Sequence, residues 1–396
     1  MAERRTLVVL ALYQLLASNR SGIFSVYFAL FLVEDKGATI AEGLIVLSAA
    51  YVASSLLGPL AGRWSDRLGR RWPFLLAGEA GSLPLFVLVP FVPGAIASGA
   101  TFIAAETVLA LGAPALTAYV ADVTTEGERG FGYGLLAASG GVGGLVGFLV
   151  VGLLIDRLGF AALFYFVGAV MVGTLTIIWV ALPNPPGKPR TERASYRGLG
   201  PLTLYSTTVS IRALGAGAVI TFYGTYAYFL GANAFDISLI AAAGLLTAAA
   251  LSIPLGRAVD RTGSYRGMLV GTGVSLLSMV LYLSAGSWEA LVPARVVYTL
   301  GFALMNPSML SYVAALAPTE RRAEFLGVFS LVNSTLWSLG PLAGGIALTF
   351  AGAPGLFVFA LVTTATTLVA LPFLERRRRA PEGGLALPPS GSPPER

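Results

Sequence analysis

The sequence contains twelve apolar stretches, each long enough to cross a lipid bilayer as a helix. A helix needs about 20 apolar residues to span the hydrocarbon core. A membrane β-barrel would instead show short segments of alternating hydrophobicity, and these are absent. We therefore predict an all-α integral membrane protein with twelve spans, which cover roughly residues 6–33, 41–61, 73–93, 97–122, 130–155, 160–182, 201–230, 236–257, 265–286, 288–315, 323–350 and 353–374.

The composition agrees with a membrane protein and excludes several kinds of chemistry. Hydrophobic residues make up 56% of the 396 residues and charged residues only 12%, too few to cover a soluble domain of this length. Cysteine and histidine are both absent, so thiolate metal sites, disulfides and histidine catalysis are impossible. We expect no enzyme activity, no cofactor and no metal, and any proton must be handled by carboxylates.

One long polar connection divides the chain into two halves. We predict a six-helix bundle over residues 1–182, a cytoplasmic linker over 183–200 and a second six-helix bundle over 201–374. The basic, Pro- and Gly-rich residues 375–396 are typical of a disordered tail. The apolar stretch after the short charged N-terminus is too long for the core of a signal peptide, so we interpret it as the first span.

The distribution of Lys and Arg predicts the orientation in the membrane. Of the 26 basic residues, 21 fall in the termini and loops on one side, two (Lys36 and Arg157) in loops on the other, and three within spans. Basic residues collect on the cytoplasmic side. We therefore predict a multi-pass inner-membrane protein with both termini in the cytoplasm, and the net charge of +6 gives no reason to expect nucleic acid as a partner.

A short motif occurs once in each half, at corresponding places. Gly62-x-x-x-Asp66-Arg67-x-Gly69 follows the second span and Gly256-x-x-x-Asp260-Arg261-x-Gly263 follows the eighth, 194 positions later. Two repeats of six spans in the same orientation form an architecture in which a central site is opened to each side in turn. The duplication therefore predicts a transporter.

These features resemble the major facilitator superfamily, whose signature loop between the second and third helices is similar to residues 62–71. The resemblance implies two six-helix bundles related by a pseudo-two-fold axis. It also implies that the loop acts as a latch that closes the cytoplasmic side in the outward-facing state. We expect Asp66 to face the start of span eleven near residues 322–325, and Arg70 to pair with Asp122. The predicted latch comprises Gly62, Asp66, Arg67, Gly69, Arg70, Asp122, Gly256, Asp260 and Arg261.

Five ionisable residues lie within the predicted spans, where each needs a partner or a water-filled cavity. They are Arg20, Glu79, Glu106, Arg212 and Arg295. Arg20 and Arg212 occupy corresponding places in spans one and seven, so the pair could form a clamp for an anionic substrate. The alternative is that each arginine is neutralised within its own half, with Glu106 as the obvious partner of Arg20.

Glu106 and Arg295 occupy corresponding places in spans four and ten, so they could form a gate between the halves. Glu106 is also the best candidate for a coupling proton site. Glu79 is a further coupling candidate, although a cap or a local pair is the simpler interpretation for it. Polar and aromatic residues on the same helices complete the predicted substrate site: Phe24, Tyr27, Tyr223, Tyr226, Asn306, Asn333 and Trp337.

Two transport functions remain open from the sequence. One is a carrier of small organic anions that uses Arg20 and Arg212; the other is a proton-coupled exporter of amphipathic, drug-like compounds that uses Glu106. Glycines in span five resemble a drug-antiporter signature, but Gly144 stands where that signature has proline, and close helix packing explains them equally well. We expect a monomer in the bilayer with a small-molecule substrate, coupled to protons or another ion.

Overall fold

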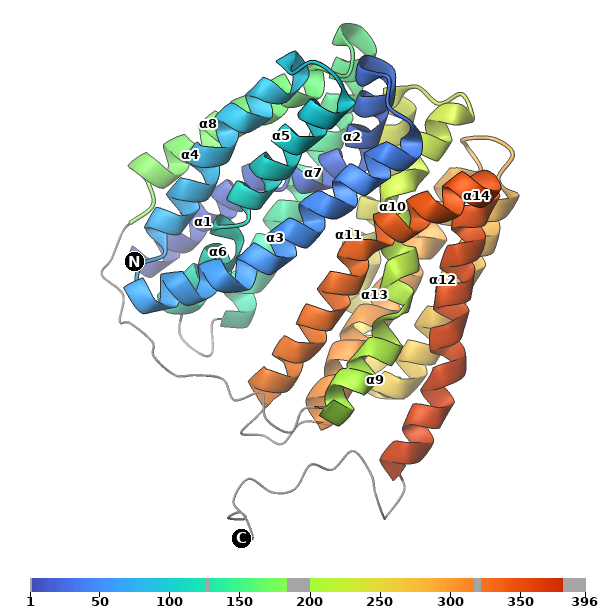
Figure 1. The fold of residues 1–396 in the computed structure, drawn as a ribbon. Coiled ribbons are helices and arrows are strands. Elements are labelled where there is room, and N and C mark those ends of the chain that lie inside the picture. Colours follow the sequence, from blue (N-terminus) through green and yellow to red (C-terminus); the bar gives the residue numbers. More distant parts are fainter. Residues whose placement is uncertain (1, 125–128, 184–199, 317–321, 380–396) are drawn as a thin grey trace, which may run out of the picture.

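The computed structural model describes residues 2–124, 129–183, 200–316 and 322–379, and within these ranges every regular element is helical (Figure 1). The N-terminal half comprises α1 (Ala2–Ala17), α2 (Ser21–Lys36), α3 (Ile40–Leu68), α4 (Trp72–Leu88), a short 3-10 helix η1 (Val89–Phe91), α5 (Ala95–Leu109), α6 (Gly112–Val123), α7 (Arg129–Leu158) and α8 (Ala162–Val180). The C-terminal half comprises α9 (Gly200–Ser210), α10 (Arg212–Phe229), α11 (Ala234–Thr262), α12 (Ser264–Ser284), α13 (Leu291–Leu316) and α14 (Arg322–Arg379).

The prediction of an all-α membrane protein is confirmed. Ten stretches of the described chain are long and apolar enough to cross a membrane. The last of them, Phe325–Phe373, contains a sharp bend at Ala351 and Gly352 and therefore consists of two successive helices. The broken pair α9 and α10 is not among the ten, so the count of twelve crossings stays a prediction.

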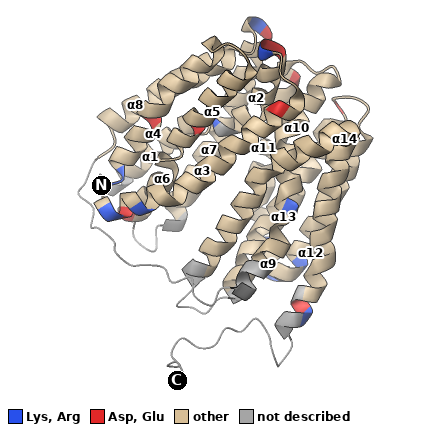
Figure 2. Ribbon diagram, in the orientation of Figure 1, with Lys and Arg blue, Asp and Glu red and all other residues tan. Residues whose placement is uncertain are grey.

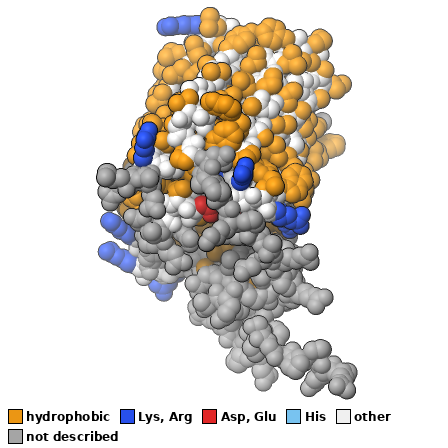
Figure 3. Space-filling view, turned by 90° about the vertical axis from the view of Figure 1, so that its left-hand side faces the viewer, with side chains coloured by type: hydrophobic (Ala, Val, Ile, Leu, Met, Phe, Trp, Pro, Cys, Tyr) orange, Lys and Arg blue, Asp and Glu red, His pale blue; other side chains and the backbone are white. Residues whose placement is uncertain are grey.

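The surface shows where the bilayer lies. Charged residues gather mainly at the two ends of the helices, with few between them (Figure 2). One face of the molecule carries a broad belt of hydrophobic side chains, with basic side chains below it and at its upper edge (Figure 3). Large apolar residues such as Leu56, Trp179 and Phe350 are exposed, as expected for side chains that contact lipid rather than water.

The helix ends show that the halves repeat in structure as well as in sequence. A capping box of Thr39 and Glu42 begins α3, and one of Asn233 and Asp236 begins α11, again 194 positions later. In each box a side chain accepts from a backbone N–H that the helix leaves unpaired. Gly69 and Gly263 then end α3 and α11 with positive φ values of 61° and 90°, which glycine adopts without strain.

The glycines of α7 allow it to lie directly against the end of α1. A Cβ atom on Gly143 would lie 1.9 Å from the carbonyl oxygen of Leu15, and one on Gly147 would lie 1.7 Å from Oδ1 of Asn19. Both approaches are too close for any side chain. Close packing therefore explains Gly143 and Gly147, whereas Gly141 has open space beside it and Gly144 makes only ordinary contacts.

Spans one and seven are both interrupted, and each interruption adjoins an arginine. Residues 18–20 form a turn between α1 and α2, so Arg20 lies at the break. α9 ends at Ser210, Ile211 interrupts the helix, and α10 begins at Arg212. The sequence predicted one continuous helix over residues 6–33 and another over 201–230. The structure differs from this prediction because each of these spans is broken into two helices.

Among the described residues, the contacts between the two halves gather toward one end. Four residues of α3 between 43 and 48 are buried, but none between 51 and 60 is; likewise most of α11 between 237 and 244 is buried, but none between 245 and 258 is. A helix that packed against the opposite half along its length would be buried on one face throughout. The bundles therefore separate toward the end where α1 begins and α14 ends (Figure 1). With the predicted orientation, this is an inward-open arrangement.

Polar contacts hold the closed end together, which is the outer end in the predicted orientation. The two carboxylate oxygens of Asp156, at the end of α7, accept from the backbone N–H groups of Ala234 (2.8 Å) and Phe235 (3.0 Å) at the start of α11. Nearby, the Tyr27 hydroxyl donates to the carbonyl of Ala234 at 2.6 Å. It also lies 2.7 Å from the hydroxyl oxygen of Ser238. Asp156 thus caps a helix of the opposite half, where a carboxylate is favoured by the unpaired N–H groups and the helix dipole.

Replacing Asp156 by Asn is expected to favour opening of the outer end. The charged cap that this change removes stabilises the closed arrangement by about 0.5–1 kcal/mol. Its loss corresponds to a roughly two- to fivefold increase in the open population. Because the chain has no cysteine, a single Leu44→Cys on α3, fully buried against α14, can report opening through its rate of modification by a membrane-impermeant maleimide.

The matched control is Asp236→Asn, which removes a carboxylate from the same end of α11. Asp236 contacts only its own half through Asn233, so modification of Leu44→Cys should stay close to the parent rate. Equal rates in the Asp156→Asn and Asp236→Asn proteins would show that the contact of Asp156 does not hold the outer end closed.

Candidate functional site

A cavity of about 450 Å³ lies in the N-terminal half. Its walls come from α1, α3, α4, α5 and α6 and from the turn that holds Arg20. The apolar lining includes Ala17, Leu75, Leu109 and Pro114. The polar lining is formed by Tyr13, Gln14, Ser18, Arg20, Ser54, Ser55, Glu79 and Glu106.

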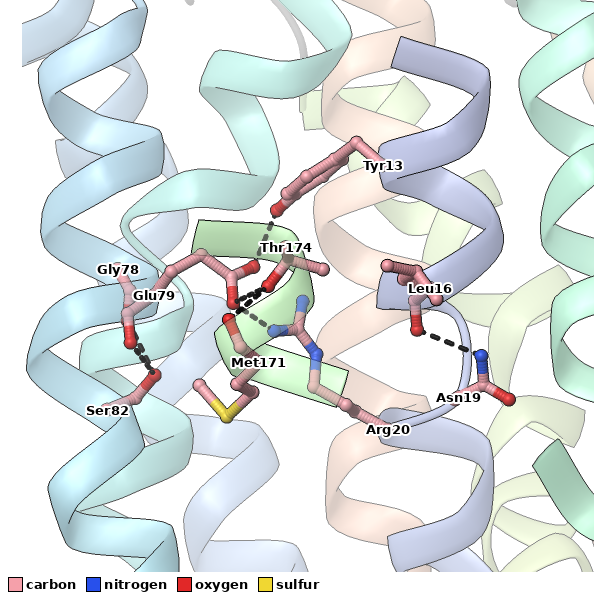
Figure 4. A network of polar contacts seen from close by, with 9 residues as sticks. All are labelled: Tyr13, Leu16, Asn19, Arg20, Gly78, Glu79, Ser82, Met171 and Thr174. Carbon is pink, nitrogen blue, oxygen red and sulfur yellow. Dashed lines mark hydrogen bonds and ion pairs between the residues drawn. The ribbon is translucent and has the colours of Figure 1, made fainter. Parts of the chain in front are cut away.

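A buried polar network occupies one wall of the cavity. Arg20 forms an ion pair with Glu79 of α4, and both side chains are almost completely buried. Tyr13 of α1 donates to the other oxygen of Glu79 at 2.7 Å, and Thr174 of α8 donates to the paired oxygen at 2.8 Å. Figure 4 shows these four side chains pointing toward one another from separate elements. The network ties α1, α4 and α8 together around one charge pair.

The partner of Arg20 is therefore Glu79, and the prediction of Glu106 was wrong. The sequence indicated only that both carboxylates lie within spans. The break after α1 turns Arg20 toward α4 (Figure 4), and sequence periodicity over a continuous helix could not show this. A guanidinium that is neutralised in this way is not free to hold an anionic substrate together with Arg212.

Glu106 faces the cavity without a hydrogen-bond partner for its Oε1 atom, which is buried. Arg20 acts on it electrostatically but is paired with Glu79. Burying an ionised carboxylate without a partner costs several kcal/mol. A proton or a cationic group on Glu106 would remove this cost.

Arg295 does not pair with Glu106, so the predicted gate between them is wrong for this arrangement. Its guanidinium carbon lies 4.8 Å from the ring centre of Tyr223 and 5.5 Å from that of Tyr298, all within the C-terminal half. Arg212 is also buried there, with Nη2 3.0 Å from the sulfur of Met309. Of the five ionisable residues predicted within spans, Arg20, Glu79 and Glu106 line the same cavity, and Arg212 and Arg295 do not.

The other predicted substrate residues have diverse surroundings. Phe24 is fully buried in an aromatic core beside Phe86 and Phe102, so it packs rather than binds. Trp337 lies 5.5 Å from Tyr51 of the opposite half, and Tyr27 also joins the halves. Tyr226 donates to the carbonyl of Ala285 at 3.1 Å. Neither Asn306 nor Asn333 lines this cavity.

In the predicted latch, the structure places Arg71 where the sequence placed Arg70. Arg71 pairs with Asp66 at 2.7 Å and with Asp122 at 3.0 Å, whereas Arg70 is exposed. Burial lowers the pKa of Arg71, but its hydrogen bonds to Asp122 and Asp66 outweigh this effect and raise the pKa overall. Arg71 is therefore permanently charged and joins the ends of α3 and α6.

The remaining latch residues are placed only in part. Gly62 approaches Pro114 of α6, while Arg67 and Arg261 are exposed and Gly256 has open space beside it. The side chains of Asp260 and of residues 322–324 lie outside the described residues. The contact between Asp66 and the start of span eleven stays a prediction.

Asp156 was missed by the sequence reasoning, although a signal exists. Gly152-x-x-x-Asp156-Arg157-x-Gly159 has the same pattern as the two motif copies described above. It stands at the outer end of α7, where a cytoplasmic latch was not sought. The pattern marks a carboxylate at a helix end, and the structure shows that this carboxylate caps α11.

Breaking the Arg20–Glu79 pair from one side should be far more damaging than removing it entirely. Glu79→Gln leaves a buried guanidinium unpaired, which costs about 3–5 kcal/mol. Arg20→Met combined with Glu79→Gln leaves no charge and should recover most of that loss. Chemical denaturation of the purified variants measures both values; additive losses would contradict a direct pair.

The two neighbouring arginines of the loop provide an internal comparison. Arg71→Ala removes two ion pairs and leaves Asp66 and Asp122 close to each other, so we expect a loss of about 1–2 kcal/mol. Arg70→Ala removes an exposed charge and should change stability by less than about 0.5 kcal/mol. Melting temperatures of both variants in detergent test this; the reverse order would favour the original assignment of Arg70.

Known proteins resemble this chain in sequence over most of its length. The sequence model of the Major Facilitator Superfamily matches residues 10–212 and 205–393. Multidrug resistance protein 2 of Bacillus subtilis is 26% identical over 326 residues, which cover 76% of this chain and 78% of that protein. An MFS-type transporter of Pseudomonas aeruginosa is 31% identical over 218 residues, so the match spans about half of each protein (54% and 52%). Methylenomycin A resistance protein of Bacillus subtilis is 31% identical over 127 residues, 32% of this chain and 27% of that protein.

Solved structures share the fold. A bacterial homologue of the human lysosomal transporter Spinster, in an inward-facing and unoccupied conformation, matches with a TM-score of 0.75 at 15% identity, covering 96% of this chain and 99% of that one. A POT peptide transporter matches with a TM-score of 0.76 at 13% identity, covering 93% and 94%. Fold, motif copies and sequence match agree: this chain belongs to the major facilitator superfamily.

Proposed function

We propose that this transporter exports amphipathic, largely apolar compounds from the cytoplasm in exchange for protons, and that Glu106 carries the coupling proton. The observation that supports this is the buried Oε1 atom of Glu106, which has no hydrogen-bond partner and borders a cavity with many apolar walls. Since the chain has no histidine, a carboxylate is the side chain suited to proton exchange.

The pairing of Arg20 favours this function over anion transport by Arg20 and Arg212. Glu79 neutralises Arg20 within its own half, so the predicted clamp loses one of its two charges. The names of two relatives, a multidrug resistance protein and a methylenomycin A resistance protein, point in the same direction. Both are resistance proteins, for which export of a compound is the simplest activity.

Alternating access would couple export of the compound to uptake of a proton. In the described arrangement the bundles separate at the end where α1 begins, so compounds could enter from the cytoplasm. Opening of the other end requires the contacts of Asp156 and Tyr27 with α11 to break. On the cytoplasmic side Glu106 would release its proton as the compound binds, and on the outer side it would take up a proton as the compound leaves, so one proton enters for each compound exported.

Glu106→Gln is expected to abolish proton-driven transport, because the amide cannot take up and release a proton. The protein is reconstituted in liposomes, an inward proton gradient is imposed, and movement of the lipophilic dyes ethidium and Hoechst 33342 is followed by fluorescence. We expect the rate to fall at least about tenfold, while exchange of dye without a gradient persists.

Glu289→Gln is the matched control, since Glu289 is exposed on the loop before α13 and should leave transport unchanged. Wild-type rates in Glu106→Gln would refute the role of Glu106. A wild-type protein that moves neither dye under the gradient would contradict the proposed substrate class.

A further inference from the structure

Two buried arginines of the C-terminal half lie on either side of one tyrosine. Arg212, at the start of α10, is only 5% exposed and its Nε atom has no hydrogen-bond partner. Arg295, on α13, has buried Nε and Nη1 atoms that also lack partners. Tyr298 lines a small cavity together with Arg212, and its ring lies 5.5 Å from the guanidinium carbon of Arg295.

The groups around the two arginines are aromatic rings and neutral hydroxyls. The hydroxyl of Tyr223 is buried without a hydrogen-bond partner, while Tyr282 is close enough to Arg295 to interact with it through its hydroxyl. Ser275 and Thr364 border the cavity beside Arg212. Tyrosine rings attract a guanidinium, but they do not neutralise it.

No described carboxylate forms an ion pair with this cluster. Residues 201–374 contain five acidic residues, all in loops or near helix ends: Asp236, Asp260, Glu289, Glu320 and Glu324. The N-terminal half, in contrast, carries Glu79 and Glu106 within its spans. Near the end of α14 the C-terminal half also buries the carboxylate of Glu375, which accepts from the Tyr312 hydroxyl, but it forms no ion pair with Arg212 or Arg295.

We propose that Arg212, Arg295 and the tyrosines Tyr223, Tyr282 and Tyr298 form a binding site for an oxyanion. Two guanidinium groups match a carboxylate or phosphate in geometry, and its oxygens could accept from the unpaired nitrogen and hydroxyl donors. Binding would relieve the cost of burying each guanidinium with unpaired donors. This proposal goes beyond the role of Glu106 and does not rest on it.

The size and place of the cavity limit what binds. The cavity beside Arg212 has about 10 Å³ and is not lined by Arg295. It admits roughly one water-sized group, so an oxyanion that reaches both arginines requires the side chains between them to move apart, and a whole compound does not fit. Gly224, next to Tyr223, packs against Val26 of the opposite half, which places the tyrosine side of the cluster beside the interface. The oxyanion is therefore either a free ion or the acidic group of a compound that lies between the halves.

Thermal unfolding of the purified full chain in lipid nanodiscs tests the site. Sodium acetate serves as a free carboxylate and sodium benzoate as a carboxylate on an apolar body. We expect benzoate to raise the melting temperature of the wild type by several degrees, and to have no such effect on Arg212→Gln/Arg295→Gln. Stabilisation by both salts identifies a free oxyanion, and stabilisation by benzoate alone identifies the acidic group of an apolar compound.

The matched control is Arg257→Gln/Arg266→Gln, which removes two exposed arginines of the same half. It should respond to benzoate like the wild type, so that a general effect of salt is separated from binding. Equal shifts in all three proteins, or no shift in the wild type, would overturn the proposal.

Two further measurements exclude a merely structural role. Without added carboxylate, Arg212→Gln should melt at or above the wild-type temperature, because it removes an uncompensated buried charge; a clear decrease would count against the site. Tyr298→Phe keeps both charges and should raise the benzoate concentration needed for half of the stabilisation roughly two- to tenfold. An unchanged concentration would remove Tyr298 from the site.

Discussion

The cost of holding charge in an apolar interior governs the structure of the membrane-spanning region. In the N-terminal half the cost is met by pairing: Arg20 contacts Glu79, and Tyr13 and Thr174 donate to the same carboxylate. Both carboxylate oxygens of that pair accept hydrogen bonds. Glu106 and the two arginines of the C-terminal half lack such partners. Since unpaired buried charges are costly, binding of a proton or a ligand at these groups would stabilise the protein more than binding at a group that is already paired.

The architecture could be predicted from the sequence because its signals are local. Runs of about 20 apolar residues mark helices without reference to any neighbour, and the motif copies that end with Gly69 and Gly263 mark corresponding helix ends. Both glycines do adopt positive φ, as a helix end requires. The close packing of α7 was also foreseeable, because glycines four apart leave room only for a backbone.

The pairing of side chains could not be predicted, because it depends on contacts between distant elements. Arg20 reaches Glu79 only because α1 ends before it, and the sequence from 6 to 33 shows no proline that would mark the break. Arg70 and Arg71 are adjacent and chemically identical, so only the course of the loop decides which one turns inward to Asp122. The third motif copy at Asp156 was visible in the sequence, but its partner across the interface was not.

The strong and weak interactions are distributed in a way that suits movement between the halves. All three ion pairs of the described residues lie within the N-terminal half, and breaking a buried pair such as Arg20–Glu79 would cost several kcal/mol. Hydrogen bonds rather than ion pairs join the described parts of the halves: Tyr27, Ser48 and Ser238 donate to backbone carbonyls, and Asp156 accepts two bonds from α11. Each contributes about 1 kcal/mol, so it can break in every transport cycle. Rigid bundles and a readily broken interface follow from this difference, and a ligand that bridges Glu106 and the arginine cluster would supply the link that the protein itself lacks.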